Sequence, residues 1–218
     1  MSGAGSESFA EFHARLCGIP LDRIWLTPPP GTATEADLIA KWETPPHSRC
    51  ELVDGTLIER SGSFLGSVIL GALARHVGRI VDEHDLGACF AGNLPYRLRP
   101  DLIRVPWFSF APWEQFPDDE VPDEKLATFT PALVVEVANT KTTTSEYDRK
   151  VREFFVAGTR LAWVIDLHTR SVKVYTSAQK SKDVEETGTL DGGKVLPGFK
   201  LPLADLFAAT KPRKKKPR

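Results

Sequence analysis

The feature that most constrains the fold of this chain is a charged residue inside an apolar segment. Residues 132–138 form a short run, rich in β-branched side chains and bounded by Pro131 and Asn139, which predicts a buried strand. Glu136 lies within this run, and an ionised carboxylate there is costly unless a metal, a cation or hydrogen-bond donors compensate it. Two interpretations stay open: a functional carboxylate, or an edge position or structural ion pair.

A helix predicted over residues 145–157 ends at Gly158 and leads to a second apolar strand over residues 161–166. Its apolar stripe comprises Tyr147, Val151, Phe154 and Phe155. Lys150 lies at the margin of this stripe, where a lysine can lay its stem on the core and extend its ammonium towards a cleft. We expect a Glu136–Lys150 pair, and the alternative is that Lys150 reaches solvent at the surface. The side chains expected to point more nearly outward are Arg149, Arg152 and Glu153.

The order of the remaining elements predicts the fold class. Strands are predicted around an Asp54-Gly55 hairpin and over residues 88–98 and 103–110, and helices over residues 34–42 and 65–80. Strands therefore alternate with helices along the chain. This order is typical of a single α/β domain in which a mixed β-sheet is flanked by helices.

The length of 218 residues and the hydrophobic content of 41% suffice for one domain with a real core. We expect a lead-in over residues 1–34, a domain over residues 35–208 and a basic disordered tail over residues 209–218. The chain contains no run of about 18 apolar residues, so no membrane span is predicted. The first residues lack the basic and apolar regions of a signal peptide. These observations predict a cytoplasmic protein with no membrane partner.

Cysteine usage gives no sign of a covalent or metal framework. The three cysteines, Cys17, Cys50 and Cys89, are odd in number, scattered and without a CxxC spacing. This pattern favours neither disulfides nor a zinc site, and reduced thiols are the expectation.

Charge is unevenly spread along the chain. The segment Lys211 to Arg218 holds six basic groups and no acid, whereas the whole chain has a net charge of −1, so the other 210 residues carry −7. A basic tail can contact the phosphates of nucleic acid without reading sequence. The alternative is a solvated end that aids solubility or contacts the acidic body.

Four segments taken together resemble a known family. They are Glu51–Glu59, Pro131–Val137, Arg149–Asp166 and Leu196–Phe199. In order and spacing they are similar to the Uma-type restriction endonucleases of the PD-(D/E)XK nuclease superfamily, over roughly residues 35 to 208. The resemblance implies a restriction-endonuclease-like fold with a four-stranded mixed core sheet, a divalent metal, Mg²⁺ or Mn²⁺, and DNA as the partner that is cleaved.

The resemblance also implies roles for individual residues. Glu136 matches the acidic residue of the (D/E)XK half-motif, as a catalytic residue and metal ligand. Ala138 occupies the usual place of the motif lysine, and Lys150 matches the catalytic lysine that has migrated to the helix in this family. Glu51 matches a recurrent acid near the start of the domain, as a second metal ligand.

Two positions depart from the family pattern. The family has an Arg-x-Pro-Asp strand whose Asp is a metal ligand, but this chain has Trp107 there, and an indole offers no lone pair to a metal. Leu65 lies in the segment where the family often has a histidine. The acids near enough in sequence to be considered as substitutes are Asp101, Asp118 and Asp119.

The sequence therefore predicts an endonuclease-fold protein in which metal-dependent hydrolysis of DNA is impaired by Trp107. The alternative is a non-catalytic module that binds nucleic acid or protein, and a third interpretation is a structural subunit that pairs with an active paralogue. An active enzyme would use Mg²⁺ or Mn²⁺, and an inactive one would need no cofactor. A homodimer is expected on the general ground that symmetric dimers are the commonest oligomers.

Overall fold

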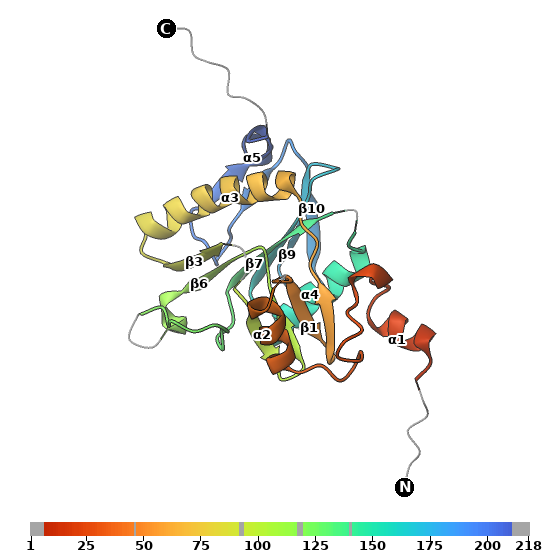
Figure 1. Ribbon diagram of the computed structural model, residues 1–218. Coiled ribbons are helices and arrows are strands. Elements are labelled where there is room, and N and C mark those ends of the chain that lie inside the picture. The colour runs from red at the N-terminus through yellow and green to blue at the C-terminus, as the bar shows by residue number, and fades with distance from the viewer. Residues whose placement is uncertain (1–6, 46, 92–93, 117–119, 140, 211–218) are drawn as a thin grey trace.

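A central sheet with helices on both faces organises the molecule (Figure 1). The computed structural model describes residues 7–45, 47–91, 94–116, 120–139 and 141–210. Helices α3 (Phe64–Glu83) and α5 (Leu203–Ala208) pack on one face, and α4 (Thr144–Ala157) packs on the other. The predicted fold class, a mixed β-sheet flanked by helices, is confirmed.

The central sheet has six strands, two more than the family resemblance implied. Their order is β10 (Ser181–Val184), β9 (Ser171–Tyr175), β8 (Leu161–Asp166), β7 (Leu133–Ala138), β6 (Phe108–Pro112) and β3 (Gly87–Ala91). Among the described residues of this sheet, β7 and β8 form the one parallel pair, and α4 connects these two strands. A parallel pair needs such a crossover, which explains why strand, helix and strand follow each other here.

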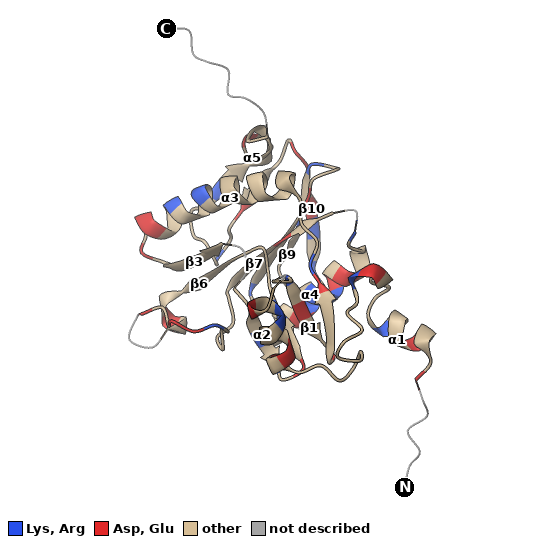
Figure 2. Cartoon of the chain, in the orientation of Figure 1, with Lys and Arg blue, Asp and Glu red and all other residues tan. Residues whose placement is uncertain are grey.

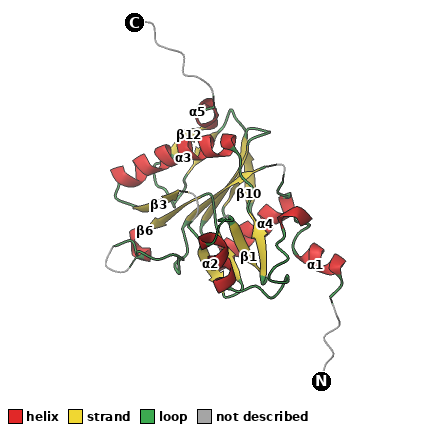
Figure 3. Ribbon diagram, in the orientation of Figure 1, coloured by secondary structure: helices red, strands yellow, loops and turns green. Residues whose placement is uncertain are grey.

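A second sheet lies beside the first (Figure 3). It is antiparallel, in the order β2 (Thr56–Glu59), β1 (Cys50–Val53), β5 (Leu102–Arg104) and β4 (Tyr96–Arg99). Asp54 and Gly55 join β1 to β2 with φ angles of 47° and 68°, the two positive values that a type I′ hairpin turn requires. A separate two-stranded ribbon pairs β11 (Thr189–Asp191) with β12 (Lys200–Pro202).

The remaining helices are α1 (Phe9–Arg15), η1 (Leu21–Arg23), α2 (Glu35–Glu43) and η2 (Trp113–Gln115). Residues at the helix ends explain where α2 begins and where α4 ends. Thr34 caps α2 as predicted, and its hydroxyl oxygen accepts a hydrogen bond from the Asp37 amide. Gly158 ends α4 with a φ of 118°, a left-handed conformation that glycine adopts without strain.

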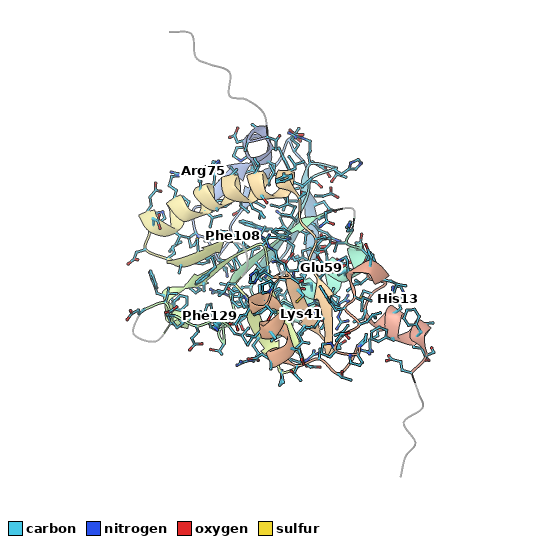
Figure 4. All side chains as sticks on the ribbon, in the orientation of Figure 1. His13, Lys41, Glu59, Arg75, Phe108 and Phe129 are labelled. Carbon is cyan, nitrogen blue, oxygen red and sulfur yellow. The ribbon has the colours of Figure 1, made fainter. Side chains whose placement is uncertain are left out.

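Strand alternation places Glu136 on the α4 face of the sheet. Successive side chains of β7 point to opposite faces. Val135 and Val137 join the core under α3, together with Phe108 (Figure 4), whereas Val134 packs with the residues of α4. Glu136 shares the parity of Val134 and therefore faces α4, which carries Lys150.

Two predicted strands were wrong in extent, because each divides between the two sheets. The predicted strand over residues 88–98 overlaps β3 and β4, and the one over residues 103–110 overlaps β5 and β6. The second break occurs at Val105-Pro106-Trp107, where the chain crosses from the small sheet to the large one. Proline has no N–H to donate to a ladder, so Pro106 is well suited to this crossing.

The segment predicted as a lead-in packs on the domain. Leu16 and Ile19 are buried, and Arg23 donates to both carboxylate oxygens of Glu146 at 2.8 Å. All three cysteines are free. The basic segment 211–218, with the two acids at 118 and 119, lies outside the described residues.

Within the described residues, one helix is long and apolar enough to cross a membrane when only length and composition are considered. This helix is α3, and eight of its residues are buried. They face the central sheet, as in the core helix of a globular domain.

Candidate functional site

The two predicted acids and the predicted lysine meet where the two sheets join. Glu51 comes from β1 of the small sheet, Glu136 from β7 of the large sheet and Lys150 from α4. All three side chains are buried. They line one small space of about 20 Å³ together with Trp107 and Arg60. The structure thus brings together residues that are 99 positions apart in the chain.

The ammonium of Lys150 occupies the centre of this group. Its Nζ lies 2.7 Å from Oε1 of Glu51 and 2.8 Å from Oε1 of Glu136. It also donates to the backbone carbonyl of Val105 at 3.1 Å. Lys150 therefore does not reach solvent, and the alternative of a surface lysine is wrong.

Glu51 is engaged through both carboxylate oxygens. Oε1 accepts from Lys150 and from the Val105 amide at 2.8 Å, and Oε2 accepts from Arg104 at 2.9 Å. Arg60 approaches Oε1 to 3.9 Å. Such a carboxylate is held in the ionised form by its neighbours.

The two acids consequently differ in acidity. Burial raises the pKa of Glu51, but the surrounding positive charges, above all that of Lys150, outweigh burial and lower the pKa to about 2. For Glu136, burial is the largest effect and raises the pKa, and Lys150 opposes it without cancelling it. One ammonium thus serves two buried carboxylates, and Glu51 receives most of the stabilisation.

Trp107 lies directly beside Glu136. It precedes β6, whose first residue Phe108 pairs with Val135, so the next position along the ladder is opposite Glu136. The indole ring lies under the Arg60 guanidinium, 4.7 Å from ring centroid to Cζ. A Cβ added at Gly62 would lie 2.6 Å from the ring, so any larger residue at this position would clash with the indole.

Around this centre lies a wider network of charges that the sequence did not predict. Arg104 is fully buried and contacts Glu153 at 2.7 Å as well as Glu51. Arg149 donates to Glu153 and to Asp54, each at 2.7 Å. The expectation that Arg149 and Glu153 point outward is therefore wrong. Glu153 turns inward to pair with the buried Arg104 of β5, and Arg149 pairs with Glu153. Figure 2 shows acidic and basic segments interleaved around α4 and β1.

A usable signal for Arg104 was present in the sequence. Arg104 interrupts an apolar strand just as Glu136 does, and a buried charge of opposite sign predicts a pair. Arg60 carries no such signal, because it follows β2 and meets Trp107 only through tertiary packing.

The residues at this centre do not fit a divalent metal. Mg²⁺ requires several oxygen ligands at about 2.0–2.1 Å, but both oxygens of Glu51 are engaged and the Lys150 ammonium lies against Oε1 of Glu136. Trp107 has only an N–H donor. Within the described ranges, no group of three or more histidine, cysteine or acidic side chains could hold a metal.

The other positions considered from the sequence do not complete the centre. Asp101 lies in an exposed turn and pairs with Arg99 at 3.1 Å. Leu65 is 45% exposed in the first turn of α3. Neither residue lines the space around Glu136.

Comparison with known proteins identifies relatives of this fold. The family model Uma2, described as "Putative restriction endonuclease", matches residues 36–204. The structure is similar to a putative nuclease belonging to DUF820 from Anabaena variabilis ATCC 29413, with a TM-score of 0.69 and 19% identity over 81% of this chain and 98% of that chain. At this identity the likeness shows the fold alone. No curated protein matches the chain.

Proposed function

This chain belongs to the Uma2 family of putative restriction endonucleases, and on that premise we propose that it binds nucleic acid while its metal-dependent cleavage is impaired. The observation that carries the proposal is the position of Lys150 Nζ, within 2.8 Å of both Glu51 and Glu136. A nuclease-fold protein with a nucleic-acid substrate is the general expectation for the family. The impairment is the finer part of the proposal, and its support is Trp107 at the position where the resemblance implies a metal-binding Asp.

Restriction-endonuclease-like families generally use divalent metals to orient and activate the attacking water. In this chain the positive charge between the two carboxylates comes from an ammonium. That cation balances the buried acids but offers no open coordination position for water. The residues at this centre therefore hold charge in place and supply no metal-based step.

The competing candidate is an active Mg²⁺- or Mn²⁺-dependent endonuclease. Its support is the retention of Glu51, Glu136 and Lys150 at one place, with Glu136 and Lys150 in the catalytic roles. A lysine there would stabilise negative charge on the phosphate. This candidate requires Lys150 to move away from both acids and a further ligand to replace what Trp107 lacks.

The direct test uses the full chain with plasmid and linear DNA in Mg²⁺ and in Mn²⁺. We expect measurable binding of DNA and little cleavage. Robust cleavage that disappears in Glu136→Ala would contradict impairment. Absence of binding to DNA and to RNA would contradict the nucleic-acid part and favour a protein-binding module or a subunit that pairs with an active paralogue.

The basic segment 211–218 is a second proposed contact with nucleic acid. Deleting it should weaken binding and flatten the salt dependence, because fewer counterions are released from the phosphates. Binding measured at several salt concentrations, for the full chain and for the deletion, gives both slopes. Equal slopes would remove this segment from the proposal.

A further inference from the structure

A cavity lies beside the Glu136 centre and shares Arg60 with it. It measures about 420 Å³ and lies where α2 packs against β1. Its apolar walls include Ile39 and Trp42 from α2, with Pro95 and Val105 opposite. Cavities of roughly 300–1,000 Å³ are the usual size for small organic ligands. The volume of the cavity therefore suits a group of about the size of a nucleotide.

The charged side chains that line this cavity are mostly basic. They are Arg49, Arg60 and Lys125, with Glu43 as the acidic member. Lys125 and Glu43 pair with each other. Arg49 is exposed and forms no ion pair with an acid in the part of the chain that the structure describes. An anionic group would complement this margin, and arginine is well suited to phosphate.

Trp42 gives the cavity a fixed aromatic wall. Its Nε1–H donates to the backbone carbonyl of Cys50 at 3.1 Å, which sets the orientation of the indole. Aromatic side chains held in this way stack on nucleobases without regard to sequence. The aromatic wall at Trp42 suits the base of a nucleotide, and Arg49 suits its phosphate.

The cavity shares lining residues with the candidate site and with a second cavity. Arg60 lines both this cavity and the small space at Glu136, and its amide donates to the Arg49 carbonyl at 2.7 Å. Arg49 and Trp107 line a second cavity of about 290 Å³ against α3. Arg49 thus borders both cavities, so a nucleotide chain with one base in the first cavity would lie beside the second.

We infer that the cavity between α2 and β1 binds one unpaired base of a single-stranded nucleic acid, with Arg49 at the neighbouring phosphate. A base inside a duplex cannot enter such a cavity unless it leaves the stack, which costs free energy. The site therefore favours single strands over duplexes. This inference rests on the proposed function, since it names the form of nucleic acid that the protein binds.

The experiment compares two probes by fluorescence anisotropy, with EDTA present and the full chain. One probe is a labelled single-stranded DNA of mixed sequence and the other is its duplex. We expect tighter binding of the single strand. Arg49→Ala should weaken single-strand binding about tenfold and duplex binding much less. The matched control is Arg160→Ala, an exposed arginine that precedes β8 and lines none of the cavities described, and it should leave both affinities nearly unchanged.

A second variant tests the cavity without changing charge. Ile39→Trp should fill it and weaken single-strand binding about tenfold or more, with thermal unfolding confirming that the variant folds. Adenosine monophosphate, followed by tryptophan fluorescence, should bind the wild type and not Ile39→Trp. Equal binding of single strand and duplex, with both variants unaffected, would overturn the inference and leave the proposed function standing. Absence of binding to the single strand, to the duplex and to a single-stranded RNA of the same sequence would overturn the proposed function. Adenosine monophosphate binding that survives Ile39→Trp would overturn the cavity assignment.

Discussion

Lys150 Nζ lies 2.8 Å from Oε1 of Glu136, yet this oxygen accepts no well-directed hydrogen bond from the described residues. Glu51, by contrast, accepts from the same ammonium at 2.7 Å and from two further donors. The lysine is therefore shared unequally between the two acids. The main role of Lys150 is to place a positive charge between two buried carboxylates, which would otherwise repel each other.

Replacing Lys150 by methionine should destabilise the protein by about 3–5 kcal/mol, because the charge that both buried carboxylates face is lost. Methionine keeps the length of the apolar stem. Urea unfolding at pH 7 measures the change in free energy. The control is Arg152→Met, an exposed residue of the same helix, which should stay within about 0.5 kcal/mol of the wild type. A cost for Lys150→Met as small as that of the control would show that the network is not structural.

The two acids should affect stability in opposite directions as pH changes. The pKa of Glu51 falls from 4.5 to about 2 on folding, so its stabilisation is complete above pH 4.5 and is lost as pH falls towards 2. The pKa of Glu136 is raised on folding, so its contribution becomes less favourable as pH rises above 4.5.

Glu51→Gln should therefore cost about 3 kcal/mol at pH 7 and flatten the acid limb of the stability curve. Glu136→Gln should cost less than Glu51→Gln at pH 7, and its cost should shrink as pH rises from 4 to 7. Urea unfolding of both variants across this range gives the comparison. If Glu136→Gln lowered the free energy of unfolding at pH 7 more than Glu51→Gln does, Glu136 and not Glu51 would be the better stabilised carboxylate.

Gly62 and Trp107 should behave as a packed pair. Gly62→Ala places a methyl group 2.6 Å from the indole, and overpacking of this kind costs about 1–3 kcal/mol. Gly78→Ala is the control, because its Cβ meets no atom within 4 Å and alanine favours the helix by about 0.5–1 kcal/mol.

The same substitution in a Trp107→Asp background distinguishes contact from backbone strain. With the indole gone, Gly62→Ala should lose most of its cost, as a double-mutant cycle of unfolding free energies would show. A cost that persists without Trp107 would mean that Gly62 is needed for its backbone alone.

Local patterns sufficed for the elements that carry the site. Strand β7 and helix α4 follow from burial and from helical periodicity, and the same periodicity placed Lys150 next to the core. The division of residues 103–110 could not be seen, because the apolar pattern continues across Pro106 while the chain changes sheets. The contact of Arg60 with Trp107 depends on tertiary packing between residues far apart in sequence.

The central claim is that a lysine ammonium, and not a metal, satisfies the acids at this site. Calorimetric titration with Mn²⁺ tests it most directly, with Trp107→Asp as the variant that restores the missing carboxylate. We expect no uptake by the wild type and uptake by Trp107→Asp. Uptake of Mn²⁺ by the wild type that is lost in Glu136→Ala would contradict the claim.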